Sequence, residues 1–127
     1  MRVLITGAFG QLGFALSKTL SEKYDVIRTD ILIPPGQTGI RLNIQNKVYL
    51  KEVIDSTSPD LIINLAAMTH VDGCELNPEL AREINIAGVQ HLCDTFNGKI
   101  IHMSTDYVFD GKNGPYSEDD PVCPISV

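Results

Sequence analysis

Three glycines near the start of the chain have the spacing of a turn that binds the pyrophosphate of a dinucleotide. Gly7, Gly10 and Gly13 follow the apolar residues 3–5 and precede a segment with helical periodicity. The first glycine allows a tight strand-to-helix turn, the second lets the backbone approach the phosphates, and the third lets the helix pack closely on the strand. N–H groups at the start of that helix then attract the phosphates. The pattern predicts a phosphate-binding turn, although glycines also gather in ordinary turns.

An acidic residue follows the second apolar segment, 25–29. Asp30 stands seventeen residues after Gly13, where a carboxylate at the tip of the second strand accepts hydrogen bonds from a ribose. The alternative is a solvated loop carboxylate. Asp30 favours NAD, because a carboxylate repels the 2′-phosphate of NADP, but Arg28 and Arg41 are near enough in the sequence to offset this repulsion. The sequence leaves the choice between NADP and NAD open.

The composition is that of one globular domain. The chain has 127 residues, of which 43% are hydrophobic and 20% charged, enough for a core but short for a complete enzyme of this kind. No apolar run approaches the ~20 residues that span a bilayer, and no signal segment follows Met1, so we expect a cytoplasmic protein without a membrane partner. The net charge of −6, with no basic stripe, argues against nucleic-acid binding.

The cysteines indicate reduced thiols. Cys74, Cys93 and Cys123 are odd in number and contain no C-x-x-C pair, which argues against a disulfide or zinc framework. His70 and Cys74 could share a helix face, but two ligands alone make a poor metal site. We therefore predict no metal.

Strands and helices alternate along the chain, a pattern that predicts a parallel sheet. The expected strands are residues 2–6, 25–29, 60–67 and 99–104, and the expected helices are 11–21, 46–56 and 77–96. Their predicted buried positions are Leu12, Ala15, Leu16, Thr19 and Leu20 in the first helix, Val48, Val53 and Ile54 in the second, and Leu80, Ile84, Ala87, His91 or Leu92, and Phe96 in the third.

Right-handed crossovers give the strand order 3-2-1-4, with the segment 60–67 outside the segment 25–29 and the segment 99–104 on the other flank of the first strand. The predicted fold is an α/β, Rossmann-like doubly wound parallel sheet. Ligands of such sheets bind at the carboxyl ends of the strands, where the strand order reverses. The glycine-rich turn and the run Ser104-Thr105-Asp106 should therefore face the same cleft.

The glycine spacing after Thr6 resembles the extended short-chain dehydrogenase/reductase superfamily, and two later segments narrow the resemblance. Residues 64–72 (NLAAMTHVD) and 104–111 (STDYVFDG) are similar to those of dTDP-4-dehydrorhamnose reductases. The resemblance covers all 127 residues, but only the amino-terminal part of such a protein. It implies an NAD(P)H-dependent oxidoreductase that reduces a 4-keto nucleotide sugar, dTDP-4-dehydrorhamnose, to dTDP-rhamnose.

The resemblance also implies which residues hold the cofactor. Gly10, Gln11 and Leu12 would wrap the pyrophosphate, and Asp30 would hold the adenosine ribose. The other implied cofactor-binding residues are Gly7 and Gly13 in the turn, Asn43 and Ile44 near the adenine, Ala66 and Ala67 on the nicotinamide side, and Thr69. Asn43 replaces the acidic residue usual in the family, so that contact keeps an acceptor but loses the charge. Asn85 stands where the superfamily often has a helix asparagine that buttresses the site; an exposed helical amide is the alternative.

Reduction of a keto-sugar needs a hydride donor, a hydroxyl that polarises the carbonyl and an acid that protonates the alkoxide. Ser104 or Thr105 can supply the hydroxyl, and the resemblance assigns polarisation and substrate binding to Thr105, with Asp106 as a further substrate-binding residue. The alternative for Thr105 is a hydroxyl that caps the end of a strand. In the superfamily the acid is a tyrosine with a lysine four residues later, and this chain has no such pair.

Residues like 124–127 precede that tyrosine in relatives. We therefore expect residues 1–127 to be the amino-terminal portion of an NAD(P)-binding Rossmann domain, lacking the Tyr-x-x-x-Lys segment and the substrate lobe, and inactive alone. One alternative is a non-catalytic regulatory protein like the beta subunit of methionine adenosyltransferase; another is a truncated dinucleotide-binding module. The uncovered flank of the last strand predicts a homo-oligomer or a partner chain.

Overall fold

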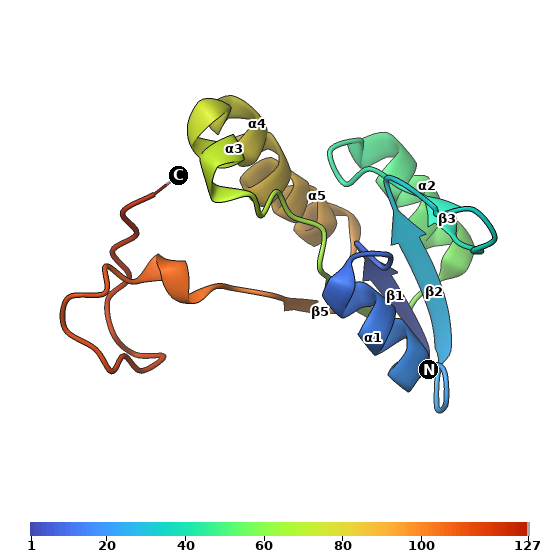
Figure 1. Cartoon of the computed structure of the whole chain (residues 1–127). Helices are drawn as coiled ribbons and strands as arrows, with labels where there is room; N and C mark the ends of the chain where they lie inside the picture. Colours follow the sequence, from blue (N-terminus) through green and yellow to red (C-terminus); the bar gives the residue numbers. More distant parts are fainter. Residues whose placement is uncertain (127) are drawn as a thin grey trace.

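Five parallel strands form one sheet in the order β3-β2-β1-β4-β5 in the computed structural model, which describes residues 1–126 (Figure 1). Val127, the last residue of the segment 124–127, lies outside the described residues. The strands are β1 (Arg2–Thr6), β2 (Asp25–Asp30), β3 (Ile40–Arg41), β4 (Leu61–Asn64) and β5 (Lys99–His102). This arrangement confirms the predicted Rossmann-like, doubly wound parallel sheet.

The order 3-2-1-4 holds for the first four strands, but the third strand is not the predicted one. β3 pairs with β2 through Thr29–Ile40 and Asp30–Arg41. The segment 60–67 contains the fourth strand, which pairs with β1, so its predicted place outside β2 is wrong. The segment 99–104, predicted next to the first strand, contains β5, which pairs with β4 instead. A strand of two residues, reached through a loop with two prolines and two glycines, carries no alternation that a sequence pattern can reveal.

Helices cover the two faces of the sheet, and each face has its own core. α1 (Gln11–Leu20) packs on one face against Val3, Ile5 and Ile63. On the other face, α2 (Lys47–Thr57) and α5 (Gly88–Thr95) enclose the larger core, which consists of Leu4, Leu42, Ile44, Leu50, Val53, Ile54, Ile62 and Leu92. Successive side chains of a strand point to opposite faces, so Leu4 and Ile5 belong to different cores.

The buried side of α1 differs from the predicted one. Gly13 and Ser17 are buried and Leu16 and Leu20 are half-buried, whereas Leu12, Ala15 and Thr19 are exposed. α1 contacts β1 and β2, and its close approach to the glycine-rich turn places Gly13 rather than Leu12 against the backbone. Part of the apolar surface of α1 is therefore left open.

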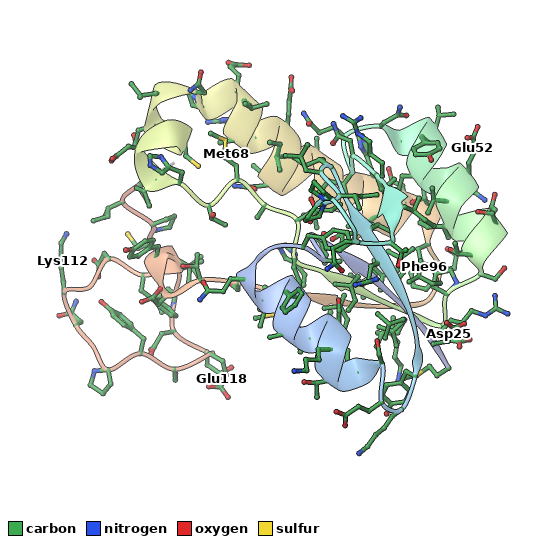
Figure 2. The ribbon with its side chains drawn as sticks, turned by 45° about the vertical axis from the view of Figure 1, so that its right-hand side comes forward. Asp25, Glu52, Met68, Phe96, Lys112 and Glu118 are labelled. Carbon is green, nitrogen blue, oxygen red and sulfur yellow. The ribbon has the colours of Figure 1, made fainter. Side chains whose placement is uncertain are left out.

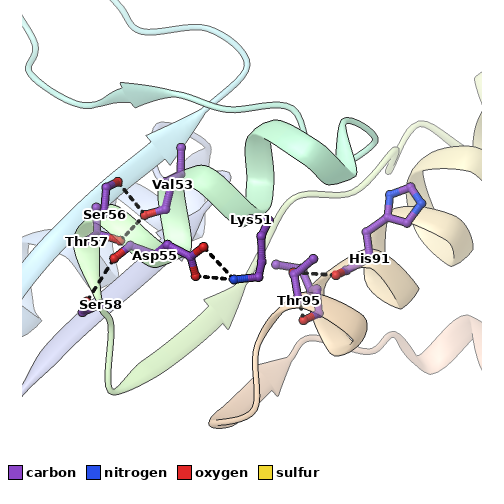
Figure 3. Close-up of polar contacts among 9 residues, drawn as sticks. Lys51, Val53, Asp55, Ser56, Thr57, Ser58, His91 and Thr95 are labelled. Atoms are coloured by element: carbon purple, nitrogen blue, oxygen red, sulfur yellow. Dashed lines mark hydrogen bonds and ion pairs between the residues drawn. The ribbon is translucent and has the colours of Figure 1, made fainter.

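Helix α2 also turns a different side inward at its start. Leu50, Val53 and Ile54 are buried, while Val48, which the sequence analysis placed inward, is 73% exposed. Val48 precedes Leu50 by two positions, about 200° around the helix, and so points away from the sheet. The hydroxyls of Ser56 and Thr57 donate to the carbonyl of Val53 near the end of the helix (Figure 3).

The long helix expected over 77–96 is continuous from Pro78 but not uniform. It consists of α4 (Pro78–Arg82), a π-helical turn η1 (Glu83–Ala87) and α5. A short helix that the sequence analysis missed, α3 (Val71–Leu76), precedes it. Leu80 is 42% exposed instead of buried. Asn85 lies in η1, and π-helical turns often occur at functional sites.

The chain leaves the sheet after β5 and forms the projecting orange-to-red segment of Figure 1. It contains the short helix η2 (Asp106–Val108) and a loop that carries Lys112 and Glu118 (Figure 2). The loop is held by its own contacts: the rings of Phe109 and Tyr116 stack with centroids 4.4 Å apart, and the Tyr116 hydroxyl donates to Asp110 Oδ1 at 2.6 Å. We call residues 109–123 the C-terminal loop.

β5 is the outermost strand of the sheet formed by the described residues. Ile101, at its centre, is 49% exposed and Met103 just beyond it is 48% exposed. Within residues 1–126, no helix has the length and apolar character that crossing a membrane requires.

Candidate functional site

A cleft of about 1150 Å³ lies at the carboxyl ends of the central strands, between the glycine-rich turn and the segments that follow β4 and β5. It brings together most of the residues that the sequence analysis proposed for the site. These are Gly7, Gly10, Gln11, Leu12, Gly13, Asp30, Asn43, Ile44, Ala66, Ala67, Thr69, Ser104 and Thr105. The turn and the segment after β5 thus face one cleft, as predicted, except that Asp106 is outside its lining.

Two of the three glycines in the turn are required by the fold itself. Gly7 has φ +65°, and a Cβ there would lie 2.8 Å from the carbonyl carbon of Leu65. A Cβ on Gly13 would lie 2.2 Å from the carbonyl oxygen of Gly7. Gly10 differs, because its Cβ would meet only that same oxygen, at 3.4 Å. No internal contact requires glycine at position 10, which is the N-cap of α1 and lines the cleft.

The Asp30 carboxylate is held at the edge of the cleft by backbone groups. Its Oδ2 accepts from the Phe9 N–H at 3.0 Å and its Oδ1 from the Leu32 N–H at 3.4 Å. Arg41, the register partner of Asp30 on β3, donates from Nε to the Ile31 carbonyl at 3.1 Å. Asp30 and Arg41 are thus neighbours on adjacent strands, with Asp30 in the lining of the cleft and Arg41 outside it.

Arg28, the second arginine considered near the ribose, has other partners. Its guanidinium lies 5.3 Å from the centroid of the Phe9 ring, and it donates to Gln37 Oε1 at 3.2 Å and to Thr38 Oγ1 at 2.8 Å. These contacts tie the loop after β2 to the glycine-rich turn, so Arg28 shapes the rim of the cleft.

Three polar side chains cross the sheet below the cleft. Thr6, Asn64 and His102 end β1, β4 and β5 and are register partners of one another along the row. Thr6 Oγ1 donates to Asn64 Oδ1 at 2.5 Å, and Asn64 Nδ2 lies 3.0 Å from His102 Nδ1. Thr6 and Asn64 are each 1% exposed, whereas His102 is exposed and lines the cleft. This row was not predicted from the sequence.

Asn85 buttresses the cleft from the π-helical turn. Its Oδ1 accepts from the Met68 N–H at 2.8 Å, and its Nδ2 donates to the Met68 carbonyl at 3.0 Å. Met68 belongs to the segment between β4 and α3 that follows Ala66 and Ala67 (Figure 2). Asn85 is half-buried, so it is not the exposed helical amide that was the alternative.

Thr105 has a local structural role. Its Oγ1 accepts from the Tyr107 N–H at 3.2 Å, as the cap of η2, and donates to Asp106 Oδ1 at 3.2 Å. The hydroxyl therefore caps the start of η2, whereas the alternative named in the sequence analysis was a cap at the end of a strand. Asp106 orients this hydroxyl from outside the lining of the cleft.

His70 and Cys74, which were considered as a pair of metal ligands, have different structural roles. His70 Nδ1 accepts from the Gly73 N–H at 2.9 Å and so caps α3. Cys74 is buried beside the cleft, with its Sγ 3.5 Å from the Met68 carbonyl. Both side chains support the segment that Asn85 also holds.

Phe9, Ile31, Leu32 and His102 line the cleft as well, and the sequence analysis did not select them. Phe9 lies inside the glycine motif, which was a usable signal. His102 precedes Ser104 by two positions, at the end of an apolar strand. Ile31 and Leu32 carry no distinguishing pattern.

A parallel sheet of this order, with a glycine-rich turn between β1 and α1 at the head of the cleft, defines a Rossmann-like domain. The chain belongs to the family described as RmlD substrate binding domain, whose model matches residues 1–127.

Curated and solved relatives agree with this assignment. The chain is 44% identical to dTDP-4-dehydrorhamnose reductase of Aggregatibacter actinomycetemcomitans, over 99% of the chain and 42% of that protein. The crystal structure of a hypothetical dTDP-4-dehydrorhamnose reductase from Sulfolobus tokodaii superimposes with a TM-score of 0.89 at 44% identity, covering 99% of this chain and 47% of the other. The dTDP-4-dehydrorhamnose reductase from Bacillus anthracis, solved in complex with NADP, superimposes with a TM-score of 0.86 at 36% identity. The match covers 98% of this chain and 44% of the other. The chain thus spans less than half the length of these relatives.

Proposed function

We propose that the cleft binds NADP(H) or NAD(H) and that the chain is the cofactor-binding part of a reductase acting on a 4-keto nucleotide sugar, dTDP-4-dehydrorhamnose. The observation that carries the proposal is the meeting of the glycine-rich turn, Asp30 and the Ser104–Thr105 hydroxyls in one cleft. Relatives with the name of this activity, one of them in complex with NADP, support it.

The pyrophosphate would lie at the start of α1. The first N–H groups of a helix have no acceptor within it, and here they belong to Gln11, Leu12 and Gly13. These N–H groups point out of the N-terminal end of the helix, which is the positive end of the helix dipole and so attracts phosphate. Gly10 leaves open the space that a phosphate needs next to the backbone.

The adenosine ribose would bind at the tip of β2. Asp30 offers carboxylate oxygens to the ribose hydroxyls and Arg41 offers a guanidinium to a 2′-phosphate. This pair would allow the site to accept either cofactor. Parallel titrations with NADPH and NADH measure the cofactor preference. Arg41→Ala should weaken the binding of NADPH more than that of NADH, and Asp30→Ala should weaken the binding of NADH more than that of NADPH.

The reacting end of the cleft would lie between Ala66–Ala67 and Ser104–Thr105. When bound, the nicotinamide supplies the hydride for the carbonyl carbon of the sugar. A hydroxyl of Ser104 or Thr105 would donate to the carbonyl oxygen and stabilise its developing charge. Thr105 now donates to Asp106, so its hydroxyl would have to turn toward the substrate, while Asp106 would hold it ready between turnovers.

Protonation of the alkoxide needs an acid, which in the superfamily is a tyrosine with a lysine four residues later. No tyrosine of the 127 residues is followed by a lysine at that spacing. We therefore propose that these residues bind cofactor and orient the carbonyl, and that they do not complete the reaction alone.

The experiment that tests the proposal is a titration of the chain with NADPH, followed by the fluorescence of the nicotinamide. The variant Gly10→Val should abolish binding while leaving the circular dichroism spectrum unchanged, because its side chain enters the cleft rather than the core. Ala15→Val, at an exposed position of α1, is the matched control and should bind normally. Equal affinity of the two variants would contradict the proposed phosphate site.

A further inference from the structure

We propose that His102 is a hydrogen-bond donor of fixed orientation in the cleft, with its proton held on Nε2 by Asn64 and Thr6, and that it binds an oxygen atom of the nucleotide ligand. The proposal rests on the proposed function, because it takes the cleft to be a nucleotide site. It adds a ligand-contacting residue, His102, and two positioning residues, Thr6 and Asn64.

The direction of the hydrogen bonds is set at Thr6. Its Oγ1 accepts from the N–H groups of Leu65 at 3.2 Å and Ala66 at 3.3 Å, the first of which is shared with the Thr6 carbonyl. A hydroxyl has two lone pairs and one proton. With both lone pairs engaged by backbone donors, which cannot reverse their roles, the proton of Thr6 must go to Asn64 Oδ1.

Asn64 transmits this direction to the histidine. Since its Oδ1 accepts from Thr6, its Nδ2 faces His102 Nδ1 at 3.0 Å. An amide NH₂ group only donates, so Nδ1 must be the acceptor and carry no proton. The neutral imidazole then bears its proton on Nε2. The arrangement follows from the backbone donors and does not depend on a choice of amide orientation.

Burial makes this chain of bonds rigid. Thr6 and Asn64 are each 1% exposed, and reversing one bond would leave a buried donor facing another donor, which is costly. His102 is the exposed end of this row of three hydrogen-bonded side chains. It lines the cleft two residues before Ser104. Because Nδ1 is occupied, Nε2–H is the ring group left for a ligand.

A ligand for this group must present an acceptor. Phosphate, carbonyl and hydroxyl oxygens all qualify, and both the cofactor and the nucleotide of the sugar substrate carry them. A purely structural role for the row requires only that His102 accept from Asn64. A structural role does not require the Nε2–H resonance to respond to a ligand. A response of that resonance therefore distinguishes a ligand-binding His102 from a purely structural one.

The first measurement is the protonation pattern of His102 in the chain without ligand, from long-range ¹H–¹⁵N spectra of the ¹⁵N-histidine-labelled protein above pH 8. We expect a protonated ε2 nitrogen and an unprotonated δ1 nitrogen. Asn64→Asp places a carboxylate, which only accepts, against Nδ1 and should move the proton to δ1. Thr6→Ser keeps the hydroxyl and should preserve the pattern of the unmodified chain. A proton on δ1 in the unmodified chain would overturn the proposal whether or not a cofactor binds.

The second measurement is titration with NADP⁺ and, separately, with dTDP, which distinguishes the two sources of the oxygen. At least one of them should shift the Nε2–H resonance of His102. His102→Leu should lower the affinity for that ligand about two- to tenfold. His102→Gln keeps a donor near the ε2 position and should retain most of the affinity. If NADP⁺ shifts the amides of Gln11 and Leu12 but neither ligand affects His102, this proposal fails and the proposed function stands. If NADP⁺ shifts none of these amides, the proposed function fails.

Discussion

Asn85 and Met68 exchange two hydrogen bonds, one from the Met68 N–H to Asn85 Oδ1 at 2.8 Å and one from Asn85 Nδ2 to the Met68 carbonyl at 3.0 Å. The pair joins the π-helical turn to the segment that leaves β4. The side-chain amide thereby replaces the backbone partner that this irregular segment lacks, and it fixes the wall of the cleft next to Ala66 and Ala67.

Replacing Asn85 with alanine should lower the free energy of unfolding by about 1–3 kcal/mol, because the Met68 N–H loses its partner and the Met68 carbonyl keeps only the weak donor Cys74 Sγ. Urea denaturation followed by circular dichroism measures the change. Gln90→Ala is the matched control, since Gln90 is an exposed amide of the same continuous helix that bonds only to exposed Asp94. It should stay within about 0.5 kcal/mol of the unmodified chain. Equal stability of the two variants would show that the Asn85–Met68 pair contributes nothing.

The glycines of the turn should separate into those that the fold needs and the one that the ligand needs. Gly13→Ala forces a Cβ to within 2.2 Å of the Gly7 carbonyl oxygen, so α1 must move and thermal stability should fall clearly. Gly10→Ala meets the same oxygen at 3.4 Å and should fold with a nearly unchanged melting temperature. Differential scanning calorimetry of both variants tests this order. A Gly13→Ala protein as stable as Gly10→Ala would mean that the packing of α1 on the turn has been misread.

The C-terminal loop should lose order in acid. The Tyr116 hydroxyl bound to Asp110, together with the Lys112 N–H, holds the pKa of the Asp110 carboxyl below its ordinary value of 3.8. A lowered pKa in the folded state stabilises the loop above pH ~4, and this contribution disappears as the pH falls through the lowered value. Carboxyl ¹³C NMR titration should show Asp110 below 3.8 in the unmodified chain. In Tyr116→Phe its pKa should rise toward 3.8, and no difference between the two would contradict the assignment.

The chain without further residues should bind cofactor but show no appreciable reductase turnover. Loss of a general acid typically costs ~10²–10⁴-fold in rate. The measurement is NADPH consumption in the presence of dTDP-4-dehydrorhamnose, with a complete reductase as the positive control. Turnover by the 127 residues at a rate comparable with that enzyme would show that an acid other than a Tyr-x-x-x-Lys pair is present.

The open flank of β5 should promote self-association at high protein concentration. Ile101 is 49% exposed on the outermost strand of the described sheet, and an apolar strand edge readily pairs with another chain. Light scattering over a range of concentrations should show a rising mass, and Ile101→Lys should reduce that rise. Val48→Lys, at a position that is 73% exposed on α2, is the control and should leave the association intact.

The parts of the fold that the sequence predicted are those with a strong local signal. The apolar runs gave strands β1, β4 and β5, and the glycine motif gave the turn, because these patterns depend on few neighbours. Val48 was misplaced because an apolar residue at the start of a helix can face either the sheet or the solvent. β3 was missed because two residues have no period.

The candidate site shows the same division. The glycine-rich turn and the run 104–106 were predicted to face one cleft, and of the candidate site residues all but Asp106 line it. The row of Thr6, Asn64 and His102 was not predicted, because it depends on the register between three strands. Register is a property of the assembled sheet and cannot be derived from any one of these segments.

The C-terminal loop is built largely on itself, through the stacked rings and the Asp110–Tyr116 bond, yet Pro124 and Ser126, directly after it, form part of the cleft wall. One wall of the cleft is therefore carried by a segment whose shape is held mainly by its own contacts and not by those of the sheet. Substitutions distant from the strands, at Phe109 or Tyr116, can change how tightly the mouth of the cleft surrounds its occupant without altering a single residue that touches it.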